Sequence, residues 1–327
     1  MLIVSDARRS TDLPRGCVAT VGNFDGLHRG QRAIVDRVIE RARELGVPSV
    51  LLTFDPHPLE VLAPERAPVR IATPRQRERL LEAAGLDVLV ELTFDAELAA
   101  LSAEDFIRQI LVGALHVGEI YVGSQFAFGK GRRGNLALLQ QMGAELGFGA
   151  FGVPERMADG EPISSSRIRR AIQEGRVEHA TELLGRPFSL TGTVVRGDRM
   201  GKRLGWPTIN IHPDGELEPL EGVYATRVYF PSFPAHFDSV TNIGTRPTVY
   251  ENYQRVIKSH VFDFVSDVYG ERVELYLFKR LRDEMLFPSV MALSAQIRRD
   301  VEAAREYFST LRRSEASAGA TPASERT

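Results

Sequence analysis

Residues 18–35 read V-A-T-V-G-N-F-D-G-L-H-R-G-Q-R-A-I-V, and this stretch decides the fold of the first half of the chain. Its first four residues are small, apolar or β-branched and predict a strand, whereas the amphipathic pattern from Gly30 onward predicts a helix. A glycine-rich turn between a strand and a helix is typical of a phosphate site, because unpaired N–H groups and the positive end of the helix dipole face the turn. The spacing matches neither a P-loop nor G-x-G-x-x-G, which excludes a P-loop kinase and a dinucleotide Rossmann site. A surface loop with an incidental His28 is the alternative.

Length and composition restrict the class of protein. The 327 residues exceed one typical domain and predict two. The net charge of −2 argues against general nucleic-acid binding, so no nucleic-acid partner is expected. No apolar run approaches a membrane span and the amino terminus lacks a signal-peptide pattern, so we expect a cytoplasmic protein without a membrane partner. The single cysteine, Cys17, excludes an internal disulfide framework and a cysteine metal cluster, and we expect a buried thiol.

The spacing of apolar residues divides the chain into two patterns. From 18 to about 185, apolar strands alternate with amphipathic helices, which predicts a Rossmann-like α/β domain with a parallel sheet covered on both faces. From 188 to about 278, alternating runs are separated by turn residues, which predicts a small antiparallel β-barrel, followed by a helix at about 289–311. The predicted domains are therefore 1–185, 186–313 for the barrel with its C-terminal helix, and 314–327 for a disordered tail.

Three further segments carry groups suited to anions. Residues 123–134 form a glycine-rich loop with three cations after a predicted strand, at the sheet edge where ligands bind. Residues 163–169 (I-S-S-S-R-I-R) place hydroxyls at a helix start, which is either an ordinary N-cap or a phosphate site. Residues 197–210 combine glycines and cations, and Thr208 and Asn210 alternate onto one face, where they could bind Mg²⁺ or phosphate oxygens. A solvated basic turn and a long hairpin loop are the alternatives for the first and third segments.

The order and spacing of these runs together resemble the bacterial bifunctional riboflavin kinase/FMN adenylyltransferase (FAD synthetase) family, to about residue 310. The resemblance is carried by G-N-F-D-G-L-H-R-G, L-T-F-D-P-H-P-L-E-V-L, F-G-K-G-R-R-G, I-S-S-S-R-I-R, L-G-W-P-T-I-N-I, N-I-G-T-R-P-T-V, D-V-Y-G and L-R-D-E-M-L-F-P-S. It implies adenylyl transfer from ATP to FMN in the amino-terminal domain, and phosphorylation of riboflavin from ATP with Mg²⁺ in the barrel. The expected partners are small molecules (ATP, riboflavin and FMN), and we expect a monomer or a weak homo-oligomer.

The resemblance also implies which residues form the two sites. In the first domain the nucleotide would lie on Gly22, Asn23, Phe24, Asp25, Gly26, His28 and Gly30, with Ser164, Ser165 and Arg167 at the ATP phosphates. In the barrel, ATP and Mg²⁺ would lie on Gly197, Lys202, Gly205, Thr208 and Asn210. The flavin would be bordered by Arg282, Glu284 and Phe287. The candidate catalytic residues are His28, Gln31, Arg167, Lys258 and Asn210.

Two of these positions depart from the family pattern. Gln31 replaces the second histidine of H-x-G-H, and a neutral amide can donate a hydrogen bond but supplies no positive charge. Lys258 stands where the family has the glutamate that acts as general base, two residues before His260. A lysine near its usual pKa is protonated at neutral pH and cannot accept a proton. Gln125 and Ala127 are further departures, in the 123–134 loop.

The departures leave three hypotheses open. The leading one is the family function, synthesis of FMN and FAD. The second is a divergent paralogue that uses another nucleotide or flavin. The third is a flavin-nucleotide binding protein that has lost one or both activities. Glu251 is a candidate substitute base in the barrel.

Overall fold

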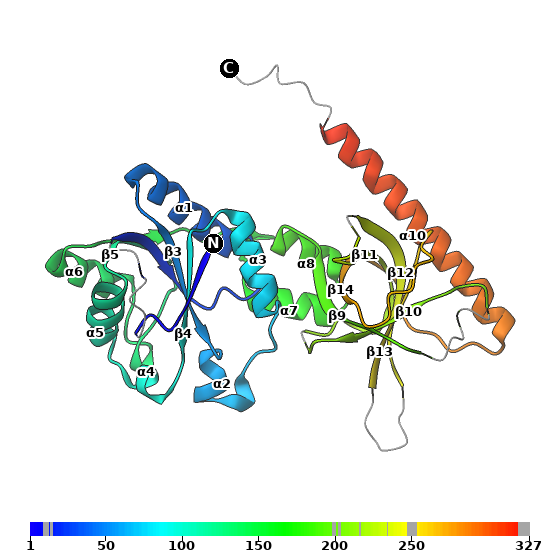
Figure 1. Cartoon of the computed structure of the whole chain (residues 1–327), viewed down its shortest axis with the longest axis horizontal. Coiled ribbons are helices and arrows are strands. Elements are labelled where there is room, and N and C mark those ends of the chain that lie inside the picture. Colours follow the sequence, from blue (N-terminus) through cyan, green and yellow to red (C-terminus); the bar gives the residue numbers. More distant parts are fainter. Residues whose placement is uncertain are drawn as a thin grey trace. The chain divides into compact units, whose positions relative to one another are not determined.

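The computed structural model describes residues 1–8, 13, 16–197, 201, 204–215, 217–233, 235–246 and 254–319. The chain divides into two compact units, Met1–Ser165 and Ser166–Thr327 (Figure 1). This division falls before the boundary predicted after residue 185, because α7 (Ser165–Gln173) and α8 (Val177–Leu184) are grouped with the barrel, where α8 packs against β14 (Arg272–Arg282). Residue 185 stays a prediction for the limit of the first catalytic domain.

The first unit is built on a parallel sheet, as predicted. Its strand order is β1-β4-β3-β2-β5-β6, and every neighbouring pair is parallel. The strands are β1 (Leu2–Ser5), β2 (Cys17–Val21), β3 (Ser49–Asp55), β4 (Val88–Thr93), β5 (Val117–Gly123) and β6 (Gly149–Val153). The edge strand β1 is not among the predicted strands, because a run of four residues at a terminus carries too short a pattern. Cys17 is buried as expected, and burial raises the pKa of its thiol to about 12.

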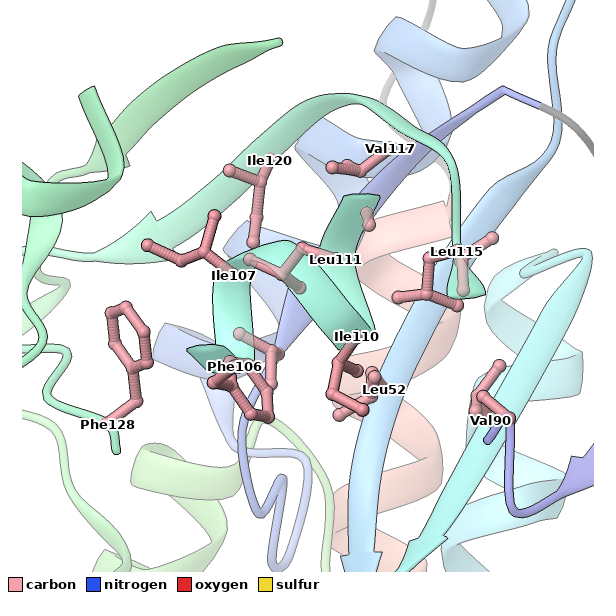
Figure 2. Packing of buried hydrophobic residues seen from close by; sticks show 14 of the residues in the cluster. Leu52, Val90, Phe106, Ile107, Ile110, Leu111, Leu115, Val117, Ile120 and Phe128 are labelled. Carbon is pink, nitrogen blue, oxygen red and sulfur yellow. The ribbon is translucent and has the colours of Figure 1, made fainter. Parts of the chain in front are cut away.

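Helices connect these strands. They are α1 (Arg29–Leu45), α2 (Pro58–Leu62), η1 (Pro64–Arg66), α3 (Pro74–Ala84), α4 (Ala96–Ala100), α5 (Ala103–Phe106), η2 (Ile107–Ala114), η3 (Lys130–Arg132) and α6 (Leu136–Leu146). Figure 2 shows Ile107, Ile110 and Leu111 of η2 packed beside Leu52 and Ile120 of the sheet. A short hairpin of β7 (Met157–Ala158) and β8 (Glu161–Pro162) then leads toward α7.

The strand order creates a switch point at β2. From β2 the chain crosses to β3 and β4 on one side, and then returns to form β5 on the other side of β2. Ligands of open parallel sheets bind outside the carboxyl ends of the strands at such a point. The turn after β2 and the 123–134 loop after β5 therefore begin at the expected ligand edge.

The second unit holds a closed antiparallel barrel, again as predicted. Its order is β10-β13-β12-β11-β14-β9. The strands are β9 (Phe188–Val195), β10 (Ile209–Pro213), β11 (Gly222–Tyr229), β12 (His236–Arg246), β13 (Gln254–Val261) and β14. Four buried hydroxyls, Thr226, Ser239, Thr241 and Ser259, hydrogen-bond to one another at 2.6–2.9 Å. Pairing among themselves removes the cost of burying these polar groups.

A long helix, α10 (Val290–Gly319), packs against β11, β12 and β14 (Figure 1). Val301, Ala304 and Phe308 join Val223 and Val240 of the barrel in one apolar cluster. The helix continues past the predicted end, so disorder was the wrong prediction for 314–319, because the Ala- and Glu-containing segment supports a helix. Residues 320–327 of the predicted tail lie outside the described residues. No helix in the described ranges is long and apolar enough to cross a membrane.

Candidate active sites

The turn between β2 and α1 is held in an unusual backbone conformation. Phe24, Gly26 and Leu27 have φ angles of +46°, +87° and +40°. Bulky residues rarely adopt positive φ, and such strain persists only where the surrounding structure enforces it. Phe24 and Leu27 are each 4% exposed and belong to the core beneath α1, so their burial supplies that enforcement. The turn is therefore shaped before any ligand arrives.

Asp25 ties this turn to two other segments. Its carboxylate accepts hydrogen bonds from the backbone N–H groups of Ile71 (2.9 Å) and Ala72 (3.3 Å). Its carbonyl oxygen accepts a hydrogen bond from Ser165 Oγ at 3.0 Å. Both residues were predicted to contact the nucleotide, whereas these groups have protein partners. The structure thus brings Asp25 and Ser165 together in an arrangement that positions the site.

His28 and Gln31 close the amino end of α1 as a capping box. His28 Nδ1 accepts from the Gln31 N–H, and Gln31 Oε1 accepts from the His28 N–H, both at 3.3 Å. Because Nδ1 is an acceptor here, a neutral His28 ring carries its proton on Nε2. Gln31 Oε1 is used in the cap, which leaves its NH₂ group as the donor. A Cβ atom on Gly30 would lie 3.2 Å from the His28 ring, so glycine makes room for that ring.

A small hollow of about 20 Å³ lies beside the turn, lined in part by Asn23, Phe24, Asp25, His57 and Arg70. Asn23 Nδ2 and His57 Nε2 are 2.9 Å apart. Burial alone would lower the pKa of the Arg70 guanidinium, but its hydrogen bonds to Glu60 and Asp55 raise that pKa overall. This edge therefore carries a fixed cation.

The other predicted residues of the first site take the following places. Gly22 begins the turn, and its N–H donates to Leu52 O at 3.0 Å. Ser164 precedes α7, and Arg167 lies in its first turn. Gln125 of the loop after β5 is exposed, whereas Ala127 is half-buried.

The second unit contains a cavity of about 240 Å³ between the outer face of the barrel and the start of α10. Its apolar lining includes Trp206, Val223, Met285, Phe287 and Ile297. Its polar lining is formed by Thr208, Asn210, Asn242, Lys258, His260, Arg282, Glu284 and Asp300. An apolar pocket with a few converging polar groups is the usual form of a small-molecule site. Thr208, Asn210, Lys258, Arg282, Glu284 and Phe287, predicted from separate segments, thus line one cavity.

The register of the barrel explains why these side chains converge. Asn210 lies opposite Lys258, and Lys258 lies opposite Asn242 on the next strand. Val223 of β11 then lies opposite both Asn242 and Arg282. Residues directly opposite one another in antiparallel strands project from the same face. One row across five strands therefore forms the floor of the cavity.

A second cavity of about 470 Å³ is lined by Gly197, Pro207, Val268 and Tyr269, among others. It shares Thr208 and Asn210 with the first cavity. A Cβ atom on Gly197 would lie 2.3 Å from Asn210 Nδ2, so only glycine lets the loop backbone lie against that amide. The two cavities thus meet at the two residues that were predicted to bind phosphate oxygens or Mg²⁺.

Several lining residues are absent from the prediction. Asn242 and His260 belong to alternating runs that place each of them on one face of its strand, but closure of the barrel is needed to bring the strands together. Trp206 lies in the loop before β10, where no periodic pattern predicts its direction. The His260 Nδ1–H donates to Pro207 O at 2.7 Å. Lys202 and Glu251 lie outside the described residues. Gly205, with φ of +82°, occupies a turn and lines neither cavity.

The donor set limits what kind of metal could bind. Among the described residues, no cluster of three or more His, Cys, Asp or Glu side chains could hold a metal. Mg²⁺ commonly takes only one or two protein oxygens and completes its shell with substrate phosphates and water. Thr208 and Asn210, which supply neutral oxygens where the two cavities meet, fit this mode of binding.

Comparison with known proteins gives one consistent assignment. Residues 10–167 match the FAD synthetase family, and residues 184–308 match the riboflavin kinase family. The chain is 40% identical to the bifunctional riboflavin kinase/FMN adenylyltransferase of Escherichia coli K12, over 90% of this chain and 93% of that protein. The Haemophilus influenzae protein of the same name is 35% identical over 95% of this chain and all of that protein.

A solved structure covers both units. The crystal structure of a macrolide-efflux protein from Streptococcus pneumoniae aligns with a TM-score of 0.85 and 29% identity, over 93% of this chain and 99% of that chain. The two family matches fall on the parallel-sheet unit and the barrel in the order that the motifs predicted. The chain belongs to the family of bifunctional riboflavin kinase/FMN adenylyltransferases.

Proposed function

We propose that this chain phosphorylates riboflavin to FMN in the barrel and transfers an adenylyl group from ATP to FMN in the parallel-sheet unit, which yields FAD and pyrophosphate. The observation that carries the kinase assignment is the meeting of two cavities at Thr208 and Asn210. A kinase must place a phosphoryl donor and an acceptor hydroxyl against each other, and it does so mainly by positioning and charge. The cavity with Trp206 and Phe287 suits a flat aromatic acceptor, and the other suits the nucleotide.

In the barrel, Thr208 and Asn210 would hold Mg²⁺ together with the nucleotide phosphates. The ion would neutralise charge on the transferring phosphoryl group. Arg282 is fixed by Asp300 through hydrogen bonds of 2.9 and 2.8 Å, so it presents a rigid guanidinium to the flavin cavity. These residues bind and orient the substrates.

In the first unit, the FMN phosphate would attack the α-phosphorus of ATP in line, and no protein nucleophile is needed. The rigid turn after β2 and the start of α1 supply backbone N–H groups and the helix dipole to the phosphates. His28 and Gln31 would donate hydrogen bonds to charge that develops on the α-phosphate. Arg167 belongs to the second unit, and its role at the ATP phosphates stays a prediction from the resemblance.

The assignment is tested by incubating the purified chain with riboflavin or FMN, ATP and Mg²⁺, and separating the flavins by chromatography. We expect FMN and FAD from riboflavin, FAD from FMN, and no product when EDTA removes the metal. FAD from FMN alone would mean that the kinase half is inactive. Flavin binding without turnover would favour the binding protein, and activity only with another nucleotide would favour the paralogue.

The finer properties remain predictions from the sequence. They are the use of Mg²⁺, a cytoplasmic location, a monomeric or weakly oligomeric state, and the absence of a nucleic-acid partner.

A further inference from the structure

We propose that Glu284 is the general base of riboflavin phosphorylation in this chain, an inference that rests on the proposed function. Transfer of a phosphoryl group to a hydroxyl requires a group that accepts the hydroxyl proton, and a positioned carboxylate commonly does so. Lys258 lines the cavity on the strand next to Asn210. A lysine side chain is ordinarily protonated at neutral pH and is then a poor proton acceptor.

Only two carboxylates line this cavity among the described residues, and one of them is already engaged. Asp300 accepts hydrogen bonds from Arg282 Nε (2.9 Å), Arg282 Nη2 (2.8 Å) and Gln296 Nε2 (2.9 Å). Glu284 makes no ion pair with any described residue, and it accepts a hydrogen bond from Asn242 Nδ2 at 3.4 Å. Glu284 is therefore the carboxylate that is available to a substrate.

The carboxylate of Glu284, an exposed residue, lies against β12. A Cβ atom on Gly244 would lie 2.3 Å from Glu284 Oε1 and 2.7 Å from Oε2, so the carboxylate rests on the bare backbone of that glycine. Asn242, two residues earlier on the same strand, donates a hydrogen bond of 3.4 Å to Oε1. Any side chain at position 244 would displace the carboxylate.

The group next to Glu284 is suited to bind a hydroxyl. Asn242 Oδ1 is buried and has no hydrogen-bond partner among the described residues. A buried acceptor without a donor is costly, and a donor from a ligand in the cavity would remove that cost. A polyol chain is rich in such donors. Asn242 lies one strand away from Lys258, and neighbouring strands are about 4.8 Å apart. The Glu284 carboxylate thus lies beside the row of side chains that runs from Asn242 through Lys258 to Asn210.

The step balances without any further reactant. The hydroxyl oxygen of riboflavin forms a bond to the γ-phosphorus of ATP, and the bond from that phosphorus to the β–γ bridging oxygen breaks. ADP leaves with the electron pair of the broken bond. The hydroxyl proton passes to a carboxylate oxygen of Glu284 and is later released to water.

The test compares Glu284→Gln with the wild type and with Asp283→Asn. The glutamine keeps the shape and the contact with Asn242 but is not a base. Asp283 is the adjacent carboxylate, lies outside the cavity and pairs with Arg280 at 2.6 Å, so its substitution is the matched control for lost charge. Riboflavin binding is followed by fluorescence of Trp206, the single tryptophan, which lines the cavity.

For Glu284→Gln we expect kcat for FMN formation to fall on the order of 10²-fold or more, the usual contribution of general base catalysis. The riboflavin dissociation constant should change less than about threefold, and the acid limb of the pH–kcat profile should disappear. Asp283→Asn should keep kcat within about twofold. A Glu284→Gln enzyme with near wild-type kcat would overturn the inference, as would a loss found instead in Glu251→Gln. Absence of FMN formation by the wild type would overturn the proposed kinase function itself.

Discussion

Gln31 carries two separable roles at the entrance of α1. Its side-chain oxygen completes the capping box with His28, and its NH₂ group remains as the donor. The sequence pattern shows this position only as a replaced histidine, whereas its capping role depends on where α1 begins. Stability and catalysis can therefore be tested apart at one residue.

We predict that Gln31→Glu lowers adenylyl transfer but not stability. Glutamate is the usual third-position partner in a capping box and suits a helix amino end, so the cap is kept. The donor is replaced by a negative charge, and loss of one preorganised donor costs on the order of 10²–10³ in kcat. The rate of FAD formation from FMN is measured together with the thermal midpoint.

The matched control for this variant is Gln141→Glu, which makes the same change of charge on an exposed position of α6. The control should keep both rate and midpoint. An unchanged rate in Gln31→Glu would remove Gln31 from the reaction, and an equal fall of rate and stability would assign it only the structural role.

At the scale of elements, the sequence predicts what local periodicity determines. The turn after β2, the parallel sheet and most barrel strands follow from patterns of apolar residues and glycines. A helix over most of η2 follows from the same patterns, but its π-helical form does not; its Ile107, Ile110 and Leu111 belong to the apolar core of the sheet. The contact of Glu284 with Asn242 also escapes prediction, since the two lie on segments that meet only after the barrel closes.

The packing of α10 on the closed barrel can be tested by its effect on the stability of this unit. Phe308 is fully buried against the barrel and packs edge to face on Phe278, with ring centroids 5.4 Å apart. The Arg227 guanidinium lies 4.9 Å from the centroid of each ring. We predict that Phe308→Ala lowers the free energy of unfolding of this unit by about 3–5 kcal/mol, the usual cost of removing a buried phenylalanine. Urea unfolding followed by Trp206 fluorescence reports on this unit.

Glu306→Ala, two positions away on the exposed side of α10, is the control and should change the free energy of unfolding by less than about 0.5 kcal/mol. A Phe308→Ala loss as small as that of the control would mean that α10 does not hold the barrel together.

The whole molecule carries two sites that rest on separate cores. The first unit has apolar clusters on both sides of its parallel sheet, and the barrel has its own cluster with α10. The carboxyl edge of a parallel sheet provides backbone N–H groups for phosphates, whereas the outer face of the barrel provides a row of side chains. Each chemistry therefore has a scaffold of its own, and loss of one should leave the other intact.

We accordingly predict that Asn210→Ala lowers FMN formation from riboflavin on the order of 10²-fold, because it removes an oxygen at the meeting point of the two cavities. Its FAD formation from FMN should stay within about twofold of the wild type. Gln31→Glu should show the reverse pattern, with FAD formation lowered and FMN formation kept.

A mixture of the two variants should then convert riboflavin to FAD after a lag, because FMN made by one chain can diffuse to the other. If neither variant alone nor their mixture makes FAD from riboflavin while each keeps its single activity, FMN must pass between sites of one chain, and the two units do not work independently.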